Sequence, residues 1–271
     1  MQEDKMMSLA IRISLVLLFM VSPLCMAGED KTISIGREFH DRTGFGDHGY
    51  KNPNPVFGRD IPLYKEYENA AKTRLQAPIG GDMILEQAIA ERRSIRSFGD
   101  QALTLEQISR ILQSANGITH SLGSYNMRSA PSGGALYPVD LYLFAFDVVD
   151  LAPGLYHYQV SDSSLELVKK GDFKDQLHTA ANEQDVADQG RISIVMTARF
   201  DRSTRKYADR GYRYTYMESG AICQNIYLQV TALGLGTTAV GAFNDDALNR
   251  LIGIDGVDEA ALLIMPIGYP K

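Results

Sequence analysis

The order of helix-like and strand-like segments after residue 82 constrains the fold most strongly. Strands are indicated by runs of β-branched and aromatic residues, and helices by apolar residues spaced three and four apart. The two kinds of segment are mixed without a regular strand–helix–strand alternation, which favours the α+β class over a parallel α/β sheet. The segments predicted as strands are 139–149, 155–160, 165–169, 192–198, 237–240 and 260–267.

Helix-end signals mark the segments between these strands. Thr104 and Gln107 form a capping-box pattern before an apolar helix. The strongest helical pattern covers 218–233 and stops at Gly234. Further helices are predicted after Asp82, with Ile84, Leu85, Ala88 and Ile89 on one face, over 173–182, and after Asn244 or Asp245.

The first 27 residues have the three-part pattern of a secretory signal. Basic residues precede an apolar run over 13–21, and a small-x-small cleavage site at 25–27 precedes Gly28. We therefore predict a protein exported to the periplasm or another extracytoplasmic space. An uncleaved anchor helix is the alternative, and membrane attachment is expected only in that case.

The composition shifts along the chain predict three parts. Residues 1–27 form the signal peptide, and residues 28–81 form an irregular arm rich in Gly, Pro, Asn and Asp, with one short helical stretch near 63–74. Regular structure over 82–271 forms a single domain.

Charge and cysteine content exclude several classes of protein. The 27 basic and 33 acidic residues give a net charge of −6, whereas a nucleic-acid-binding protein is normally basic, so no nucleic-acid partner is expected. Removal of residues 1–27 leaves Cys223 as the single thiol, which excludes an internal disulfide or a cysteine metal cluster. Cys223 lies in an apolar helical pattern and is expected to be a buried small hydrophobe. No metal site is predicted.

Two runs have the composition of a site for an anion or a flat ligand. In Arg92-Arg93-Ser94-Ile95-Arg96, an extended backbone would point residues 92, 94 and 96 the same way and form a phosphate receptor. A solvated basic patch at a helix end explains the same run. In Pro131-Ser132-Gly133-Gly134-Ala135-Leu136, the glycines let the backbone approach a flat ligand, although an ordinary loop before a strand has the same composition.

Two later runs also have two interpretations each. Residues 206–214, beginning with Lys206-Tyr207, alternate basic and aromatic side chains. They fit a solvated helix face or a pocket lined by proton-transfer groups. Residues 233–243 are rich in Gly, Ala and Thr and include Gly241-Ala242. They fit simple close packing, or backbone amides held against a cofactor ring.

Taken together, the order and spacing of these runs resemble the nitroreductase family, and within it the azoline-oxidase (SagB-type dehydrogenase) branch. The resemblance covers about residues 82–270. Arg-Arg-Ser-x-Arg is similar to the family's phosphate-binding segment, and Pro-Ser-Gly-Gly-x-Leu-Tyr-Pro to its second flavin-contacting loop. Lys206-Tyr207, Glu218-x-Gly220 and Gln224-Asn225 are close to the branch's own signature, whereas Ala221 stands where the branch often has His.

The resemblance implies an FMN-binding α+β fold with a central, mainly antiparallel sheet flanked by helices, and an intertwined homodimer with both flavins at its interface. Arg92, Ser94 and Arg96 would bind the FMN phosphate, with Arg93 contributing mainly backbone. Lys206 and Tyr207 match a pair implicated in taking a proton from the substrate. Contacts to the flavin of the partner subunit would come from Pro131, Ser132, Gly133, Gly134 and Leu136. The reactive edge of the flavin ring would lie at Gly241 and Ala242.

Three functions follow as hypotheses. The leading one is an FMN oxidoreductase that moves hydride between the flavin and an unidentified small-molecule or peptide substrate, with Lys206 or Tyr207 as base if its pKa is lowered. The second is an NAD(P)H-dependent reductase of nitro compounds or quinones, against which export counts because nicotinamide donors are scarce outside the cytoplasm. The third is a non-catalytic flavin-binding module that has kept the fold.

Overall fold

The computed structural model describes residues 35–44, 62–76, 81, 83–123 and 125–271. The chain divides into two units, Met1–Arg42 and Thr43–Lys271. In the first unit, helix α2 (Ile35–Arg42) carries a hydrogen-bonded ion pair of 2.9 Å between Arg42 and Glu38, one turn apart. The predicted signal peptide lies outside the described residues. No helix in the part of the chain that the structure describes is long and apolar enough to cross a membrane.

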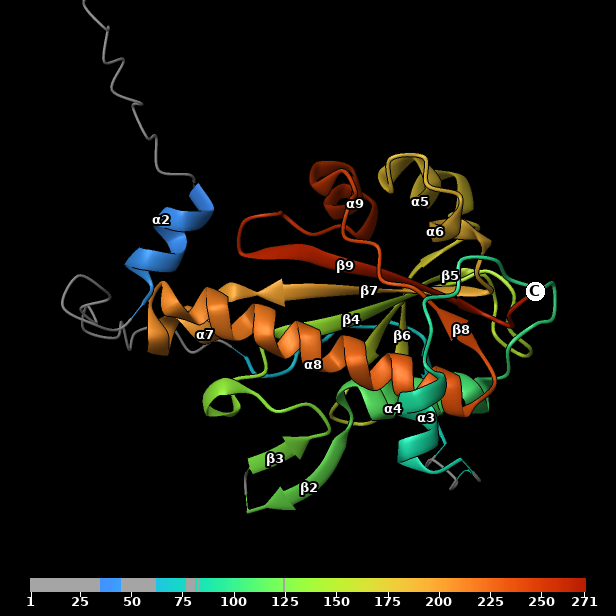
Figure 1. Ribbon diagram of the computed structural model, residues 1–271, viewed down its shortest axis with the longest axis horizontal. Coiled ribbons are helices and arrows are strands. Elements are labelled where there is room, and N and C mark those ends of the chain that lie inside the picture. Colours follow the sequence, from blue (N-terminus) through green and yellow to red (C-terminus); the bar gives the residue numbers. More distant parts are fainter. Residues whose placement is uncertain (1–34, 45–61, 77–80, 82, 124) are drawn as a thin grey trace, which may run out of the picture. The chain divides into compact units, whose positions relative to one another are not determined.

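A seven-stranded sheet forms the centre of the second unit (Figure 1). Its order is β1-β6-β5-β4-β7-β9-β8, and each neighbouring pair is antiparallel. The predicted α+β class with a mainly antiparallel sheet is therefore confirmed. The strands of this sheet are β1 (Lys72–Arg74), β4 (Val139–Ala145), β5 (Gly154–Gln159), β6 (Ser164–Lys170), β7 (Ile192–Arg199), β8 (Gly236–Thr237) and β9 (Glu259–Gly268).

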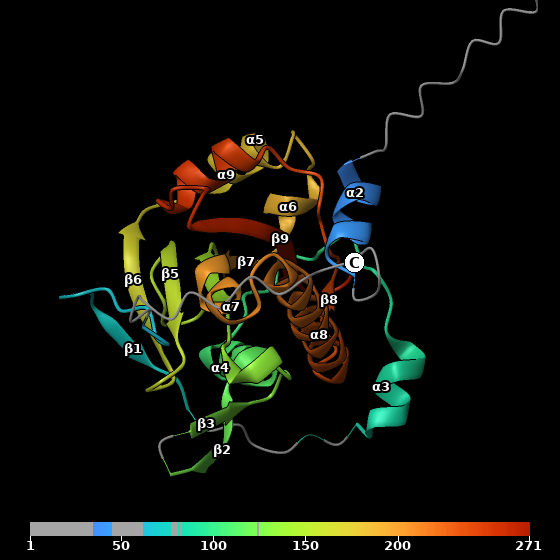
Figure 2. The same cartoon turned by 90° about the vertical axis from the view of Figure 1, so that its left-hand side faces the viewer.

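Helices cover both faces of this sheet (Figure 2). Helices α4 and α8 lie on one face, and α5, α6 and α9 lie on the other. A separate two-stranded hairpin, β2–β3, and a short 3₁₀ turn over 133–135 complete the unit. The bounds of the other elements are α3 (Leu85–Glu91), α4 (Leu105–Asn116), β2 (Ile118–Leu122), β3 (Tyr125–Arg128), α5 (Lys174–Ala180), α6 (Val186–Gln189), α7 (Phe200–Tyr207), α8 (Arg210–Ala232) and α9 (Asp245–Ile252).

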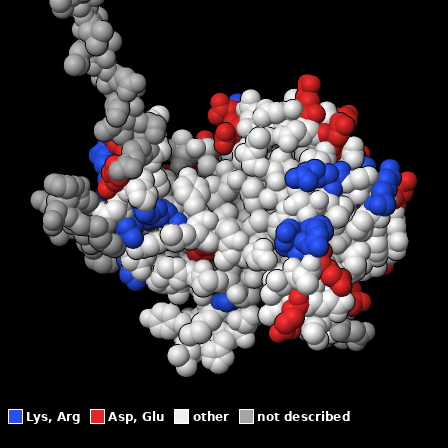
Figure 3. Space-filling model, in the orientation of Figure 1, with Lys and Arg blue, Asp and Glu red and all other residues white. Residues whose placement is uncertain are grey.

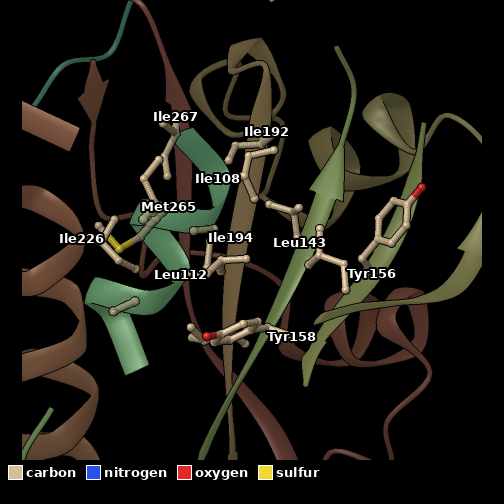
Figure 4. Packing of buried hydrophobic residues seen from close by; sticks show 14 of the residues in the cluster. Ile108, Leu112, Leu143, Tyr156, Tyr158, Ile192, Ile194, Ile226, Met265 and Ile267 are labelled. Atoms are coloured by element: carbon tan, nitrogen blue, oxygen red, sulfur yellow. The ribbon is translucent and has the colours of Figure 1, made fainter. Parts of the chain in front are cut away.

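The alternation of side chains along β4 produces a core on each side of the sheet. Leu143 packs in the cluster that contains Leu112 of α4 and Ile226 of α8 (Figure 4). The next residue, Phe144, belongs to the opposite cluster together with Leu248 of α9. Because strand side chains point alternately to the two faces, a nearly continuous apolar run is what a strand covered on both faces requires.

Several local predictions are confirmed. Thr104 and Gln107 make both hydrogen bonds of the capping box at the start of α4, and Asn244 caps α9 by accepting from the Ala247 amide at 2.9 Å. The predicted hairpin over 155–169 is β5–β6. Gly234 follows α8 with a φ of +67°, the left-handed conformation that ends many helices.

The predicted helix near 63–74 is wrong, because this segment pairs with the edge of the sheet instead. Its last residues form β1, and the Leu167 amide of β6 donates to the Ala71 carbonyl at 2.9 Å. The long helix also begins at Arg210, eight residues before the predicted start at Glu218. Both differences arise from tertiary packing that supplies hydrogen bonds or contacts which the local pattern does not reveal.

Helix α3 lies differently from the expectation for an amphipathic core helix. Asp82, its predicted cap, lies outside the described residues, and the N-cap is Ile84, without a side-chain hydrogen bond. Of the predicted apolar face only Ala88 is buried, whereas Leu85 and Ile89 are exposed. Most of this predicted apolar face is therefore uncovered in the chain.

Candidate functional site

The predicted site residues fall into two groups, and helix α8 runs between them. Near its first turns, a Cβ placed at Gly133 would lie 3.4 Å from the Tyr214 ring. Near its end, the Arg92 guanidinium lies 5.2 Å from the centroid of the Tyr227 ring. Tyr214 and Tyr227 are separated by about 20 Å along the helix axis at 1.5 Å per residue. Within one chain the two groups therefore lie apart.

Tyr227 is the centre of the group at the end of α8. Its hydroxyl lies 3.2 Å from the Ser94 hydroxyl and accepts a hydrogen bond of 2.9 Å from the Ala239 amide. The Arg92 guanidinium packs on the face of its ring. Sequence reasoning missed Tyr227, because an aromatic residue between Ile226 and Val230 is expected in any buried helix face.

The segment after α3 lies beside β8, which fixes where Ser94 and its neighbours point. Ser94 pairs with Thr237 in a parallel bridge, and the Ile95 amide donates to the Thr237 carbonyl at 2.9 Å. Gly236 permits this approach, since a Cβ there would lie 2.7 Å from Cβ of Ile95. Arg92 and Ser94 both meet Tyr227, whereas the Arg96 side chain is exposed.

The Arg93 side chain caps the carboxyl end of α3. Its Nη1 donates to the carbonyls of Ala90 and Arg92, at 2.8 Å each, and so satisfies acceptors at the end of α3. Its guanidinium is therefore engaged with the helix end, and its neighbours Arg92 and Arg96 are the candidates for binding an anion.

Gly241 and Ala242 follow directly after the contacts made by Tyr227. Val240 pairs with Ile264 through hydrogen bonds of 2.8 and 3.0 Å, and the Gln184 side-chain amide donates to the Ala242 carbonyl. Gly241 and Ala242 are exposed, and a Cβ at Gly241 would meet only Leu263, at 3.9 Å. Their backbone is thus open to a ligand beside the Arg92 segment.

The surface around the segment that carries Arg92 also carries charged side chains. Basic groups lie over the part of the face where β8 and the segment after α3 are found, with acidic groups beside them, whereas the surface over the middle of α8 is mainly uncharged (Figure 3). An anionic ligand would therefore find positive charge at the Arg92 end of the helix.

The second group gathers around Gly134. Gly134 has a φ of +70°, and a Cβ there would lie 2.6 Å from the Tyr207 hydroxyl and 2.8 Å from Lys206 Nζ. The backbone conformation therefore favours glycine, and the tips of the Tyr207 and Lys206 side chains occupy the space that a Cβ would take. The Tyr207 ring packs edge-on against Tyr214 with centroids 4.9 Å apart. The structure brings Lys206, Tyr207 and Gly134 together from runs that are about seventy residues apart in the sequence.

Hydrogen bonds that involve Ser132 and Tyr137 fix the loop that carries Gly134. The Ser132 hydroxyl accepts from the Tyr137 amide at 2.9 Å, and the Tyr137 hydroxyl accepts from the Arg128 amide at 3.2 Å. Ser132 and Leu136 are half-buried, while Pro131 and the two glycines are exposed. The exposed backbone of this loop therefore carries small residues and is held in place by these hydrogen bonds.

Four charged side chains are buried beneath this loop: Arg128, Asp140, Arg202 and Glu218. Arg202 forms an ion pair of 3.0 Å with Asp140. Burial alone would raise the pKa of Asp140, but Arg202, His157 and Arg128 outweigh burial and hold that pKa below its ordinary value. Sequence reasoning assigned no role to these residues, because only the tertiary structure brings them together.

The pKa of Glu218 is shifted in the opposite direction to that of Asp140. Burial raises the pKa of its carboxyl to about 7, although Ser132 and Arg128 each act to lower it. Its two carboxyl oxygens are buried and make no hydrogen bond of normal geometry with the described residues. Glu218 therefore changes charge near neutral pH, where its neighbour Asp140 remains ionised.

Cys223 is the free thiol of the described chain and is half-buried against the core. Burial raises the pKa of the thiol, against an opposing effect of the Arg92 charge. A raised pKa keeps the thiol protonated and weakly reactive. Among the described residues, no three His, Cys, Asp or Glu side chains gather closely enough to hold a metal ion.

Comparison with known proteins identifies the family. Residues 89–269 match the model of the nitroreductase family. The chain belongs to the nitroreductase family. The candidate nitroreductase MJ1384 of Methanocaldococcus jannaschii is 37% identical over 194 residues, which cover 72% of this chain and 95% of that protein.

Two further proteins are similar to this chain. The microcin B17-processing protein McbC of Escherichia coli is 27% identical over 147 residues, which cover 52% of this chain and 54% of McbC. This nitroreductase-family chain thus matches about half of McbC. The crystal structure of a candidate nitroreductase from Ralstonia eutropha superimposes with a TM-score of 0.64 at 27% identity, covering 80% of this chain and 97% of that one.

Proposed function

We propose that this nitroreductase-family protein is an FMN-dependent oxidoreductase of the SagB-type branch, which passes hydride between the flavin and a small-molecule or peptide substrate. The observation that carries the proposal is the convergence of Lys206 and Tyr207 on Gly134 of the 131–136 loop. The likeness to McbC, a microcin B17-processing protein by its name, supports the branch.

The phosphate end of FMN fits the group around Tyr227. Arg92 supplies positive charge and Ser94 a hydroxyl at Tyr227, and the exposed Arg96 adds a second guanidinium two residues further along the chain, which is the donor set that a phosphate prefers. The open backbone at Gly241 lies on the same side of α8, as its neighbour Ala239 contacts Tyr227. The residues present therefore fit a flavin mononucleotide, which would supply the hydride-transfer chemistry.

The two groups of residues support a homodimer. About 20 Å of α8 separates Tyr214 from Tyr227, so the Gly134 loop of one protomer cannot close over a ligand held at its own Arg92 segment. A two-fold axis that places one α8 against its copy in the opposite direction would bring the Gly134 loop of each protomer to the Arg92 segment of its partner. Each flavin site would then be formed by both subunits.

The surface of α8 and α3 supports the same assembly. Met217, which is 66% exposed, and Gly220 and Gln224 form an open stripe at helical spacing, and a Cβ at Gly220 would contact nothing within 4 Å. The exposed Leu85 and Ile89 of α3 add apolar area on a helix that contacts α8. Exposed apolar area of this kind is typical of a surface that a partner covers.

Lys206 and Tyr207 are the proposed proton-transfer groups. They end α7, and Lys206 Nζ lies 5.3 Å from the centroid of the Tyr207 ring. A substrate that loses hydride from carbon must also lose a proton, and these two side chains border the loop that would face the flavin. The substrate would lie between this pair and the flavin ring.

Export remains part of the proposal and follows from the signal-like residues 1–27. N-terminal sequencing of protein isolated from the producing cells is expected to begin at Gly28. An active protein that retains Met1 in the cytosol would overturn export and favour a nicotinamide-dependent reductase.

The proposed function is tested by purifying the full chain and measuring its flavin and its mass together. Mass spectrometry is expected to find FMN at about one per subunit, and light scattering a dimer. Anaerobic mixing with NADPH that bleaches the flavin rapidly would favour the reductase over the dehydrogenase. FAD, or no uptake of flavin, would contradict the proposal, and flavin that no donor or substrate reduces would indicate a binding module.

A further inference from the structure

Glu218 is a buried acid that the proposed chemistry does not use. The Glu218 side chain is 3% exposed and lies on α8 below the 131–136 loop. It belongs to the Glu218-x-Gly220 pair, for which the sequence predicts no role. A buried carboxyl whose oxygens make no normal hydrogen bond is costly, and it persists in a fold only where surrounding groups compensate.

The groups that face Glu218 come from three elements. Arg128 lies at the end of β3, Asp140 and the Val139 backbone lie on β4, and Ser132 lies in the loop above. Arg202 of α7 forms an ion pair with Asp140, and the charge on Arg128 interacts with both Asp140 and Glu218. Ionised Glu218 would balance this cluster, and neutral Glu218 would leave it with one net positive charge.

The Ser132 hydroxyl can connect this cluster of charged side chains to a ligand that lies against the loop. Its oxygen already accepts from the Tyr137 amide at 2.9 Å, so its own hydroxyl proton remains to be donated elsewhere. When Glu218 is ionised, its carboxylate attracts that proton, because a charged acceptor is stronger than a neutral one. When Glu218 is protonated, the hydroxyl is released to donate to whatever lies against the loop.

We propose that Glu218 is a positioning residue whose protonation state sets the direction in which the Ser132 hydroxyl donates, and thereby the grip of the 131–136 loop on the flavin. This inference rests on the proposed function, in which the loop contacts FMN. A raised carboxyl pKa, to about 7, places the change within the range of ordinary cellular pH.

The test is flavin titration of the full-length dimer between pH 5.5 and 8.5, followed by fluorescence, for wild type, E218Q and S132A. Wild type is expected to bind riboflavin and FMN about threefold to tenfold more weakly above pH 8 than below pH 6, which corresponds to one hydrogen bond. E218Q is expected to bind as wild type does at low pH, without the change. S132A is expected to bind weakly at every pH, and E218Q should alter S132A no further.

Two controls remove the titration of the FMN phosphate: binding of riboflavin, and the ratio of the FMN affinities of wild type and E218Q. Riboflavin has no phosphate to titrate, and the ratio of wild-type to E218Q affinity for FMN cancels the titration of the phosphate at each pH. Thermal unfolding at each pH verifies that the variants are folded. Equal pH profiles for wild type and E218Q, with flavin bound by both, would overturn the role of Glu218 and leave the proposed function intact.

A second readout needs no flavin and separates the two proposals. Hydrogen exchange at the Tyr137 amide, corrected for the intrinsic effect of pH, is expected to slow above pH 7 in wild type, because an ionised Glu218 holds Ser132 in place. E218Q should remove this change. If no flavin binds while the exchange behaves in this way, the proposed function fails and the coupling of Glu218 to Ser132 stands. An unchanged exchange profile would overturn that coupling.

Discussion

The Tyr227 hydroxyl of α8 lies 3.2 Å from the Ser94 hydroxyl on the segment that follows α3. The same Tyr227 hydroxyl accepts from the Ala239 amide at 2.9 Å. One buried phenol therefore joins the run predicted to bind phosphate to the run predicted to border the flavin ring. Neither run contains Tyr227, and the connection arises only because α8 passes beneath both.

Replacing Tyr227 with Phe tests this connection. Tyr227→Phe is expected to lower the free energy of unfolding by about 1 kcal/mol, because the Ala239 amide loses its acceptor, and to weaken FMN binding severalfold. Denaturant unfolding and isothermal titration measure the two effects. Tyr125→Phe, at an exposed position of β3, is the matched control and should change neither quantity. Wild-type FMN affinity in Tyr227→Phe would mean that Ser94 is not part of the site.

The arginines are tested by comparing two ligands. Arg92→Ala and Arg96→Ala are expected to weaken FMN binding by about tenfold to a hundredfold each, because each loses a charge-assisted contact to phosphate. Riboflavin, which lacks phosphate, should bind wild type and both variants about equally. Arg250→Ala, on the exposed side of α9, controls for the loss of surface charge. Isothermal titration that finds unchanged FMN affinity in both variants would place the phosphate elsewhere.

Gly134→Ala tests the convergence on Lys206 and Tyr207. The backbone φ of +70° disfavours alanine by about 1–2 kcal/mol, and the new methyl group would overlap both side chains. We expect a lower melting temperature and a large loss of flavin affinity. Gly123→Ala, which has a φ of +60° but nothing within 4 Å, carries the same backbone cost without the overlap. Equal flavin affinity in the two variants would argue against a role for the overlap.

Met217→Asp tests the dimer. A carboxylate at this stripe would be buried in the proposed interface at a cost of several kcal/mol, so the protein is expected to become monomeric and to lose its flavin. Light scattering at micromolar concentration and the flavin absorbance measure both outcomes. Val257→Asp, at a residue that is 78% exposed in the turn before β9, is the control and should remain dimeric. A Met217→Asp dimer with a full flavin content would place the interface on another surface.

Glu218 also predicts how stability depends on pH. Its pKa is about 7 in the folded chain against an ordinary value of 4.5, so the folded state holds one more proton between those values. Stability from this group therefore falls as pH rises from about 4.5 to about 7, and is constant above. The difference in unfolding free energy between wild type and E218Q should change by about 3 kcal/mol over this range.

Other carboxyls act in the opposite direction at lower pH. The pKa values of Asp140 and Glu166 lie below their ordinary values, because their basic partners outweigh the effect of burial. Their stabilisation is present above the ordinary carboxyl range and is lost as pH falls through it. Subtracting the E218Q curve removes these contributions, and a flat difference between pH 5 and 8 would contradict the raised pKa of Glu218.

The amino-acid sequence by itself determined the strands, the capped helix α4 and the α+β class. These follow from the alternation of apolar side chains and from local hydrogen bonds, such as those of Thr104 and Gln107, which depend on neighbours within a few residues. The sequence also predicted the four runs of a flavin site, because their order and spacing together resemble the nitroreductase family, although each run alone had a second interpretation.

Only the tertiary structure decided which of these residues meet. Tyr227 became the partner of Ser94, the 63–74 segment became a sheet edge instead of a helix, and Lys206 came to lie against Gly134. It also desolvated Glu218 while pairing Asp140 with Arg202, so two acids of similar intrinsic pKa came to differ at neutral pH. The physical reason is that desolvation and long-range contacts depend on surfaces brought together by the whole fold, which no local pattern of residues specifies.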